Sequence, residues 1–579
     1  MISKTTLGLG LVTLLSLGVT SGLASAATVD YNTDENELNI MRKTECGIIK
    51  KLIIKKKYPT DCYTNYQLFG KTNLYKESEA KKGIKIAGFN IWNLGFNQTR
   101  FKDLKVIAAM MDSWDLIGMV EIIPILGSKP GGDGYNNKNI DRLVLEIEEL
   151  AEQGSLSTKD AKKLEALKLA LSDAEKLYRA PGYIKLLDEL RTRDSSWSLI
   201  LSPRDLGVAG LREMTGYFFR AIKVRPQINE YCDDVKVKDE GVGYACVPTF
   251  NTAGIMKKDY RPVFSKRPFM ASFKSADFDF TMLAIHTKFR SPKPELQKQI
   301  LKLAYGVDNY KDVPGLRADN YYRFAETQTT LQFIHKLKQK YPSEKDIIFV
   351  GDFNLNGDEK YWDEAISRDI GAKLFIDIAK TSVSEYLIDT QSGKETHGRA
   401  NNYDHFIFND KNVTECDGKN AYVEDFYKNT YTARSILRKY VIRSTEQGSI
   451  TNFDDQGNIV ELVGYPLLSK KLYIMTRHLD RLEKSLIAKK MVNTKFKVVT
   501  DPIYVSKVTM DKYIKNIGAQ VLSVLSDREV RIKYLVSELK RRVYTSQQTL
   551  KKYYAVYKES LSDHLPIVMS CKTSTGDDD

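Results

Sequence analysis

Apolar residues along the chain gather in short runs that are separated by polar segments. The runs at 84–92, 115–123 and 279–287 are rich in Ile, Leu and Phe. Runs of this length and composition are typical of buried β-strands. Runs of the same kind recur at 216–224, 269–274, 346–354, 403–408 and 565–570.

Two segments between these runs, 100–112 and 319–340, have patterns that predict helices. Strands that are mixed with helices in this order favour a fold in which sheets lie inside and helices outside. We therefore expect an α/β sandwich with two central sheets.

The segment 125–181 interrupts the series of strands. Its apolar positions recur at spacings of three and four on either side of a break at Gly154 and Ser155, which predicts a helical hairpin. Ser157 and Asp160 are placed like a capping box at the start of the second helix. The apolar positions are Leu143, Ile147, Leu150, Leu164, Leu167 and Leu171.

The chain is long and basic. Its 579 residues include 88 Lys plus Arg against 74 Asp plus Glu, a formal net charge of +14, and 42% of the residues are hydrophobic. This composition excludes collagen-like and wholly disordered proteins, and the length corresponds to about three or four domain equivalents. The excess of positive charge favours a polyanionic partner, either nucleic acid or an anionic membrane.

Most of the excess charge lies in the segment 411–560, which contains 28 Lys plus Arg and 16 Asp plus Glu. We expect this basic block to be a mainly helical insertion. It contains KRR at 540–542 and KK at 551–552, close to three tyrosines, which would suit phosphate pairing with base stacking. The alternative is an ordinary solvated helical surface. The tyrosines are Tyr553, Tyr554 and Tyr557.

The first 27 residues have the features of a secretory signal peptide. Lys4 supplies a positive charge, 7–17 is an apolar stretch, and Ala24 to Ala26 form a small-residue cleavage site. The alternative is a membrane anchor, but the stretch is short for a span of ~20 residues. We expect cleavage near Ala26, a mature chain that is secreted or periplasmic, and no stable membrane insertion.

The six cysteines predict disulfides, because cysteines of exported proteins commonly form them. The sequence has no Cys-x-x-Cys pair, so a zinc ribbon is not indicated. Six cysteines allow many pairings. Closeness in sequence favours Cys46 with Cys62 and Cys232 with Cys246. The remaining pair is Cys416 with Cys571, and each of these lies just beyond a predicted strand.

Most of the predicted strands end in residues that bind a metal or move a proton. Asn90 follows IKIAGF, Glu121 follows DLIGMV and His286 follows TMLAI. One such residue is more often a cap or a turn residue, but buried carboxylates must be paired or bind a cation. The repetition over several strands therefore favours a shared site. Its other candidates are Asp352 and Asn354 in GDFN, Asp404 in YDHFIF, and Asp563 and His564 in SDHLP.

The ordered motifs GDFN, YDHFIF and SDHLP resemble those of the endonuclease/exonuclease/phosphatase superfamily, to which secreted deoxyribonucleases belong. The resemblance covers residues 84–410 and 561–571, without the two inserted segments. It implies a four-layered α/β sandwich of two mixed sheets flanked by helices. The expected organisation is a signal peptide (1–27), an N-terminal extension (28–83), a catalytic domain (84–410 plus 561–571) with insertions at 125–181 and 411–560, and an acidic tail (572–579).

The resemblance implies a role for each strand-end residue. Asn90 would contact the phosphate or orient a metal ligand, and Glu121 would bind the metal with help from Asp563, although Val120 stands where the family commonly has Gln. Asp352 and Asn354 would position the nucleophile and the phosphate. Asp404 and His564 would form the Asp/His pair.

Three further residues follow from the same resemblance. His286 would pair with Glu213, as a central His and an earlier Glu do in the secreted deoxyribonucleases. The segment FSKRPF resembles a phosphate-contacting Arg-Pro segment, which nominates Arg267, with Lys266 as the alternative. A disulfide in the loop before this segment would be Cys232–Cys246.

These residue types suit the hydrolysis of a phosphodiester. Glu121 and Asp563 offer oxygen ligands for a hard divalent ion, Mg²⁺ first and Mn²⁺ or Ca²⁺ otherwise. His564, oriented by Asp404, would be the general base for water. His286, with the Asn and Arg side chains, would polarise the phosphate or protect the leaving oxygen.

We therefore expect an exported, metal-dependent endonuclease that hydrolyses DNA, its expected nucleic-acid partner. The sequence leaves open whether RNA is a second substrate, and it leaves open the oligomeric state. One alternative is a sphingomyelinase-type phosphodiesterase, which would need an exposed apolar hairpin; the best candidate segment is 459–468. Another is a catalytically idle binding protein. Inositol polyphosphate phosphatases are disfavoured because NNYDHFIF replaces their Trp-Cys-Asp-Arg segment.

Overall fold

The computed structural model of the chain describes residues 67–70, 74–95, 102–123, most of 139–176, 180–203, 213–236, 241–250, 255–384, 398–425, 452–453, 459–460 and 557–574. The predicted signal peptide and the predicted Cys46–Cys62 pair lie outside the described residues. So does most of the basic block.

Seven strands form the first large sheet. They lie in the order β1 (Gln67–Phe69), β4 (Trp197–Leu201), β5 (Met214–Arg220), β3 (Leu116–Ile122), β2 (Ile84–Leu94), β17 (Ile567–Cys571) and β14 (Tyr422–Val423). The central pair β2 and β3 is parallel, and the other neighbours are antiparallel. The sheet is therefore mixed, as expected.

The second large sheet is also mixed, with one parallel pair among antiparallel neighbours. Its strands lie in the order β12 (Ala372–Phe375), β13 (Asp404–Asn409), β11 (Ile347–Asp352), β10 (Phe278–His286), β9 (Phe269–Ser275), β8 (Ala245–Cys246) and β7 (Gly241–Val242), and β6 (Arg225–Pro226) also pairs with β9. Here β10 and β11 form the parallel pair. A separate two-stranded sheet joins β15 (Asn452–Phe453) to β16 (Ile459–Val460).

The two large sheets pack face to face over a shared apolar core. Gly88 marks the closest approach, because a Cβ atom there would lie 2.5 Å from a methyl carbon of Val350 in the opposite sheet. The buried hydroxyl group of Tyr217 lies 2.7 Å from the carbonyl oxygen of Phe269 and 3.0 Å from that of Met282, and so connects the sheets.

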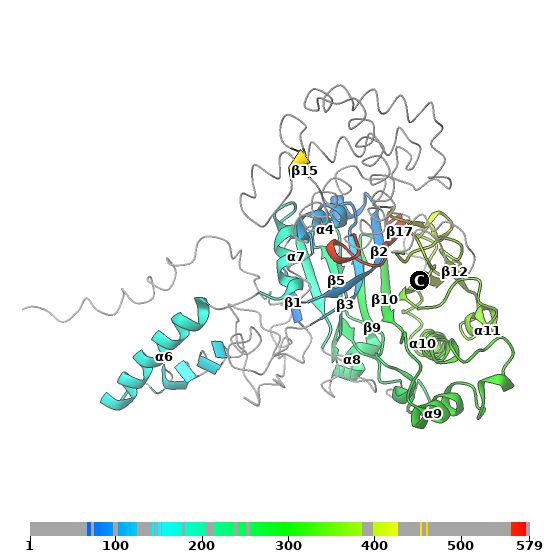
Figure 1. Ribbon diagram of the computed structural model, residues 1–579, viewed down its shortest axis with the longest axis horizontal. Helices are drawn as coiled ribbons and strands as arrows, with labels where there is room; N and C mark the ends of the chain where they lie inside the picture. The colour runs from blue at the N-terminus through cyan, green and yellow to red at the C-terminus, as the bar shows by residue number, and fades with distance from the viewer. Residues whose placement is uncertain are drawn as a thin grey trace, which may run out of the picture.

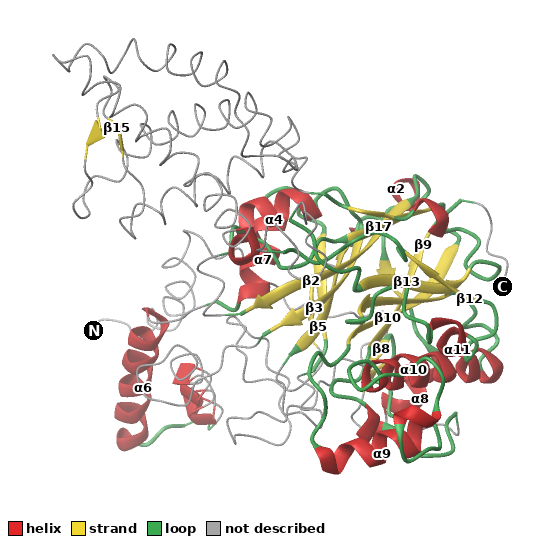
Figure 2. Ribbon diagram, turned by 45° about the vertical axis from the view of Figure 1, so that its right-hand side comes forward, coloured by secondary structure: helices red, strands yellow, loops and turns green. Residues whose placement is uncertain are grey.

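Helices cover the two outer faces (Figures 1 and 2). The first sheet packs against α4 (Leu104–Met111) and α7 (Gly182–Arg191). The second packs against helices that follow or precede its strands: α8 (Glu230–Lys236), α9 (Pro294–Ala304), α10 (Tyr321–Lys340) and α11 (Trp362–Ile366). This arrangement of helix, sheet, sheet and helix is the expected four-layered α/β sandwich.

The helical hairpin of 125–181 is described in part. The helix α6 (Thr158–Lys176) begins after Ser157, whose Oγ accepts a hydrogen bond of 3.2 Å from the backbone N–H of Asp160, as the capping pattern predicts. Ala174 is buried against Ile140 and Leu143 from the first half of the hairpin.

The structure moves three of the expected boundaries. Residues 67–69, placed in the N-terminal extension, form β1 of the first sheet, and Phe69 is buried there. Tyr557, considered for base stacking, is fully buried in the core under the first sheet. Thr573, placed in the acidic tail, is also buried. Segments this short contain too few residues for a periodic pattern.

Two of the three predicted disulfides are present. Cys232 bonds to Cys246, beside β8, and Cys416 bonds to Cys571 at the end of β17. The second bond attaches residues before β14 to the end of the last strand. Residues 411–425, at the start of the expected basic insertion, thus belong to the sandwich, since β14 pairs with β17.

Candidate active site

Polar side chains from both sheets meet at one edge of the sandwich. In the second sheet, strand pairing places His286 beside Asp352 and Asp352 beside Asp404. In the first sheet, Asn90 pairs with the residue before Glu121. Because parallel strands carry their carboxyl ends to the same edge, residues far apart in the sequence come together there. We call them the strand-end cluster: Asn90, Glu121, Glu213, Lys266, His286, Asp352, Asn354, Asp404, Asp563 and His564.

Asn90 connects the two sheets within this cluster. Its side-chain amide donates one hydrogen bond to Glu121 Oε1 at 3.0 Å and another to Asp352 Oδ2 at 2.9 Å. Its Oδ1 accepts the backbone N–H of Trp92 at 2.9 Å. Both amide hydrogens are therefore committed to carboxylates. Of the two roles expected for Asn90, orientation of a metal ligand fits this geometry better than direct contact with phosphate.

The backbone of the cluster is strained at four non-Gly residues. Trp92, Asn93, Glu121 and Asn354 have φ of 52°, 56°, 61° and 50°, and such left-handed conformations tend to persist at functional sites. Here the Asn93 N–H donates to Glu121 Oε2 at 3.2 Å, and the Asn354 N–H donates to Asp352 Oδ1 at 2.9 Å. The unusual backbone thus directs two donors at two carboxylates.

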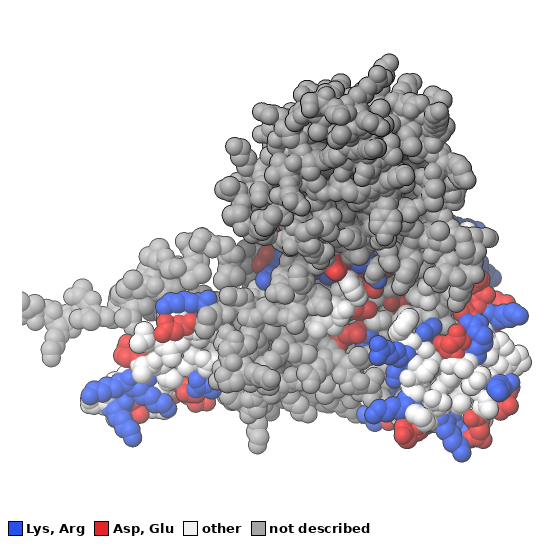
Figure 3. Space-filling model, viewed as in Figure 1, with Lys and Arg blue, Asp and Glu red and all other residues white. Residues whose placement is uncertain are grey.

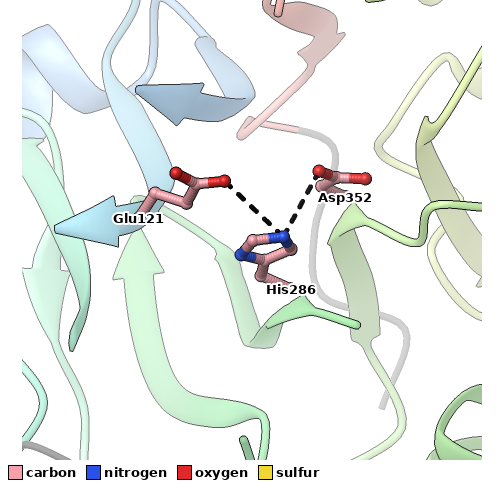
Figure 4. A group of neighbouring side chains, drawn as sticks. All are labelled: Glu121, His286 and Asp352. Atoms are coloured by element: carbon pink, nitrogen blue, oxygen red, sulfur yellow. Dashed lines mark ion pairs between the residues drawn. The ribbon is translucent and has the colours of Figure 1, made fainter. Parts of the chain in front are cut away.

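Asp352 lies at the centre and is 1% exposed. Its Oδ2 is 3.6 Å from His286 Nε2 and 3.4 Å from His564 Nε2. His286 Nε2 is also 3.6 Å from Glu121 Oε1, so this imidazole lies between the two carboxylates (Figure 4). Burial raises the pKa of Asp352, but His564 and His286 lower it overall. Asp352 is therefore a carboxylate at neutral pH.

Gly351 makes this position of Asp352 possible. Its φ is 149°, and a Cβ atom would lie 1.9 Å from the carbonyl oxygen of Ile285 on β10. A side chain cannot be accommodated at that distance. The glycine of the GDFN motif thus allows β11 to approach β10 where both strands deliver their functional residues.

His564 and Asp404 form a buried pair. His564 Nδ1 lies 2.6 Å from Asp404 Oδ2, and the Ser562 hydroxyl accepts the backbone N–H of His564 at 3.0 Å. With the Nδ1 hydrogen donated to Asp404, the other ring nitrogen, Nε2, faces Asp352. Burial lowers the pKa of His564, but Asp404 and Asp352 raise it well above its ordinary value overall.

His286 has two partners on its Nδ1 side. Glu213 Oε2 lies 2.9 Å and Lys266 Nζ 2.7 Å from Nδ1, and Lys266 also forms an ion pair with Glu213. The structure thus brings together the His286 and Glu213 that the sequence paired. Burial and Lys266 lower the pKa of His286, but Glu213 and Glu121 raise it overall.

The FSKRPF segment contributes Lys266 to the cluster, where it contacts Glu213 and His286. The charge of Arg267 acts on Asp259, whose pKa is lowered chiefly by a hydrogen bond from Arg261 and to a smaller degree by Arg267. The expected contact of Arg267 with phosphate stays a prediction, and Lys266 stays its alternative.

The cluster has the charge and the donors that suit a divalent cation. Asp563 Oδ1 is buried and has no hydrogen-bond partner within the described part of the chain. Burial and the nearby Glu121 carboxylate raise the pKa of Asp563, His564 lowers it, and the result is a pKa of about 6. Ligand atoms of Glu121, His286 and Asp352 also lie within 4.8 Å of one another. Carboxylate oxygens of this kind are ligands for Mg²⁺, so the residues fit the expected metal.

Asn354 and three unpredicted residues complete the surroundings. The Asn354 amide donates to the carbonyl oxygen of Thr287 at 3.0 Å. Lys102 Nζ donates to the carbonyl oxygens of Ile91 and Leu561, each at 2.7 Å, and so ties β2 to the SDHLP segment. Ser562 lies within that motif and was open to prediction. Lys102, and Thr381, whose Oγ1 accepts the Asp404 N–H at 3.0 Å, have no local signal.

No family model and no curated protein matches the chain. Solved structures that match include an endonuclease/exonuclease/phosphatase family protein from Bacteroides thetaiotaomicron, at 13% identity and a TM-score of 0.27, with 56% of this chain and 83% of the other covered. A second, from Leptotrichia buccalis, matches at 12% identity and a TM-score of 0.30, with 56% of this chain and 87% of the other covered. Another is the human Nocturnin catalytic domain with a bound sulfate anion (11%, 0.27, 59% and 86%).

The first two structures are described as endonuclease/exonuclease/phosphatase family proteins. This is the family that the GDFN, YDHFIF and SDHLP motifs resemble. At these identities and TM-scores the likeness does not extend to substrate or activity. The two stacked mixed sheets and the strand-end cluster of this chain define the class: an α/β sandwich with the groups that phosphoester hydrolysis needs.

Two further observations concern the charges on the described surface and the apolar character of the described helices. Where Figure 3 shows the region of α9 and α10, basic and acidic side chains are interspersed rather than separated. Among the described residues, none of the helices combines the length and the apolar character needed to span a bilayer.

Proposed function

We propose that this protein is an exported, divalent metal-dependent phosphodiesterase that hydrolyses nucleic acid, DNA in the first place. The observation that carries the proposal is the buried Asp404–His564 pair, whose imidazole Nε2 lies 3.4 Å from Asp352 Oδ2. The residue before His564, Asp563, has a buried Oδ1 without a hydrogen-bond partner among the described residues. A base, an anchored carboxylate and oxygen ligands for a cation are the groups that such a reaction requires.

His564 is the proposed general base. Asp404 accepts the Nδ1 hydrogen, fixes the tautomer and leaves Nε2 as the atom that takes a proton from water. The carboxylates around it keep its pKa high and the ring protonated. Their charge must be offset before Nε2 accepts a proton, and this requirement is a further reason to expect a cation in the cluster.

Glu121 and Asp563 are the proposed holders of that cation, with Asn90 orienting Glu121. The bound ion would supply stabilisation of the negative charge that develops on the phosphate. His286, held by Glu213 and Lys266, presents Nε2 to the same space and is suited to donate a hydrogen bond to a phosphate oxygen or to the leaving oxygen. Asn354 holds Asp352 in place through its backbone N–H.

Nucleic acid is the proposed substrate class because of the charge balance. The chain carries +14 overall, and Lys or Arg residues that neutralise phosphates gain affinity by releasing counterions. Export follows from the predicted signal peptide and is part of the proposal. A lipid phosphodiester is the competing substrate, and a phosphomonoester is a third.

The test is a substrate panel with the purified mature chain. Supercoiled plasmid, RNA, sphingomyelin vesicles and 4-nitrophenyl phosphate are each incubated with Mg²⁺ or with excess chelator. We expect nicking of the plasmid that chelator abolishes and added Mg²⁺ restores. Release of phosphocholine or nitrophenol without nicking would reject the substrate class, and nicking in chelator would reject the metal.

A further inference from the structure

Trp92 lies at the margin of the strand-end cluster in an unusual conformation. It follows Asn90 by two residues, and its backbone N–H donates to Asn90 Oδ1 at 2.9 Å. Both Trp92 and Asn93 have left-handed backbone, where the pairing of β2 with β3 shifts register. A bulky residue rarely adopts this conformation, and its presence beside a site points to a functional use of the side chain.

Two lysines accompany the Trp92 ring. Lys102 Nζ lies 5.2 Å and Lys558 Nζ 5.5 Å from the ring centroid. The two lysines come from opposite ends of the described chain, and Lys102 is buried. A partly buried aromatic ring with positive charge beside it combines a stacking surface with attraction for a phosphate.

A second aromatic ring, Phe289, lies three residues after His286, the last residue of β10, in the loop beyond the second sheet. It is 60% exposed, although large apolar side chains are usually buried. The Arg323 guanidinium lies 5.3 Å from its ring centroid. Arg323 also donates to the carbonyl oxygens of Phe289 at 2.7 Å and of Asn354 at 2.8 Å. The ring is therefore held to a residue of the cluster.

Trp92 lies in β2 of the first sheet and Phe289 lies just beyond the end of β10 of the second. Each ring has a cation beside it, and each is linked by hydrogen bonds to a cluster residue. Bases stack on such rings only when they are not stacked on neighbouring bases in a duplex. We propose that Trp92 and Phe289 are stacking platforms for the nucleotides around the scissile phosphate, and that the preferred substrate is single-stranded nucleic acid. This inference rests on the proposed function and adds strand preference to it.

A lipid surface is less well matched by these residues. Aromatic side chains that enter a membrane present their rings outward, whereas Trp92 is only partly exposed and has two lysines close to its ring. Lys102 Nζ is fixed by two backbone carbonyl groups rather than extended toward headgroups. Charge beside the ring and close attachment to the cluster favour a strand that passes through the site.

The experiment compares single-stranded and duplex DNA of one sequence, both end-labelled. The full chain and the variants Trp92→Leu, Trp92→Phe, Phe289→Ala and Tyr422→Ala are assayed with Mg²⁺ for kcat/KM. The same strands are titrated in chelator, where fluorescence anisotropy reports binding without cleavage. Tyr422 is the matched control because it is also an exposed aromatic residue, on the edge strand β14.

We expect the wild-type chain to prefer the single strand by at least tenfold. Trp92→Leu and Phe289→Ala should each weaken single-strand binding and kcat/KM by roughly tenfold, which is the usual scale for one stacked base. Trp92→Phe should recover most of the loss, and the losses should shrink when the strand carries abasic residues. Tyr422→Ala should match the wild type.

Equal use of duplex and single strand, or losses no larger than that of Tyr422→Ala, would overturn the inference while nuclease activity stands. Absence of cleavage of both DNAs by the wild type would instead reject the proposed function. Weaker binding of Phe289→Ala to phosphatidylcholine and phosphatidylglycerol vesicles, with unchanged binding to DNA, would assign the rings to a lipid surface and also overturn the inference.

Discussion

The parallel strands β10 and β11 carry a buried polar group at each end, and the two groups differ in kind. The carboxyl ends deliver His286 and Asp352 to the strand-end cluster. The opposite ends lie near a second network, in which Glu344 Oε2 accepts hydrogen bonds from Asn229 Nδ2 at 2.8 Å and from Thr281 Oγ1 at 2.7 Å. Glu344 Oε1 also accepts the Glu230 N–H at 3.2 Å.

The comparison shows that burial of a carboxylate does not by itself mark a site. Within the described part of the chain, Glu344 accepts its hydrogen bonds from neutral donors and from no histidine, and burial raises its pKa. In the strand-end cluster the carboxylates share histidines, the backbone is strained, and Asp563 Oδ1 has no protein donor within the described residues. We infer that one end serves chemistry and the other serves stability.

The largest expected effect is the loss of the base. His564→Ala should lower the rate of nicking by about a thousandfold or more, within the range for a lost acid–base catalyst and its partner. His335→Ala, a histidine on α10, is the matched control. Nicking rates and thermal unfolding of both variants test this. A rate for His564→Ala within tenfold of the control would remove His564 from the mechanism.

The second effect concerns the cation. Glu121→Gln keeps the size of the side chain and removes its charge, so we expect roughly a hundredfold lower activity and a higher Mg²⁺ concentration for half-maximal rate. A titration of activity with Mg²⁺ measures both. If the variant had the Mg²⁺ requirement of the wild type, the ion would be held elsewhere.

At the opposite end the expected effect is on stability. Asn229→Ala would remove the amide that donates to Ser272 Oγ at 2.9 Å and to Glu344. Leaving buried acceptors without a donor costs about 1–3 kcal/mol, so the free energy of unfolding should fall by that amount. Urea unfolding measures it, and nicking should stay within twofold of the wild type. A large loss of activity at unchanged stability would contradict the division of roles.

A further effect on stability is the pH dependence of a third buried carboxyl group. Glu326 accepts a hydrogen bond from the Ser265 N–H at 3.0 Å, and burial raises its pKa to about 7 from 4.5. Since the unfolded chain releases this proton at lower pH than the folded chain, the free energy of unfolding should fall as pH rises from 4.5 to 7, by about 1.4 kcal/mol per unit.

Glu326→Gln should flatten this part of the stability profile. Urea unfolding of both chains at several pH values between 4.5 and 7 provides the comparison. A slope that persists in the variant would show that another group causes it. The result also bears on the contrast above, because Glu326 and Glu344 are both buried carboxyl groups whose pKa is raised by burial.

Much of the site was accessible from the sequence, because strand-end residues follow apolar runs and occur in short motifs. Asn90, Glu121, His286, Asp352 and the SDHLP residues come together as expected. The disulfides Cys232–Cys246 and Cys416–Cys571 were also predicted.

The remaining features depend on tertiary structure. The contact of Lys266 with His286 depends on how the loop before β9 folds against β10, which the sequence does not show. The left-handed backbone of Trp92 has no signal, since no glycine marks it. The network around Glu344 joins residues from three separate segments through sheet pairing, and no local pattern connects them.

The central claim is that the two ends of β10 and β11 have different tasks, and matched carboxylate-to-amide changes test it most directly. Asp352→Asn and Glu344→Gln are compared for the rate of plasmid nicking in the same Mg²⁺ buffer. We predict a loss of at least a hundredfold for Asp352→Asn and less than twofold for Glu344→Gln. Equal losses, or retained nicking in Asp352→Asn, would contradict the assignment of the strand-end cluster as the active site.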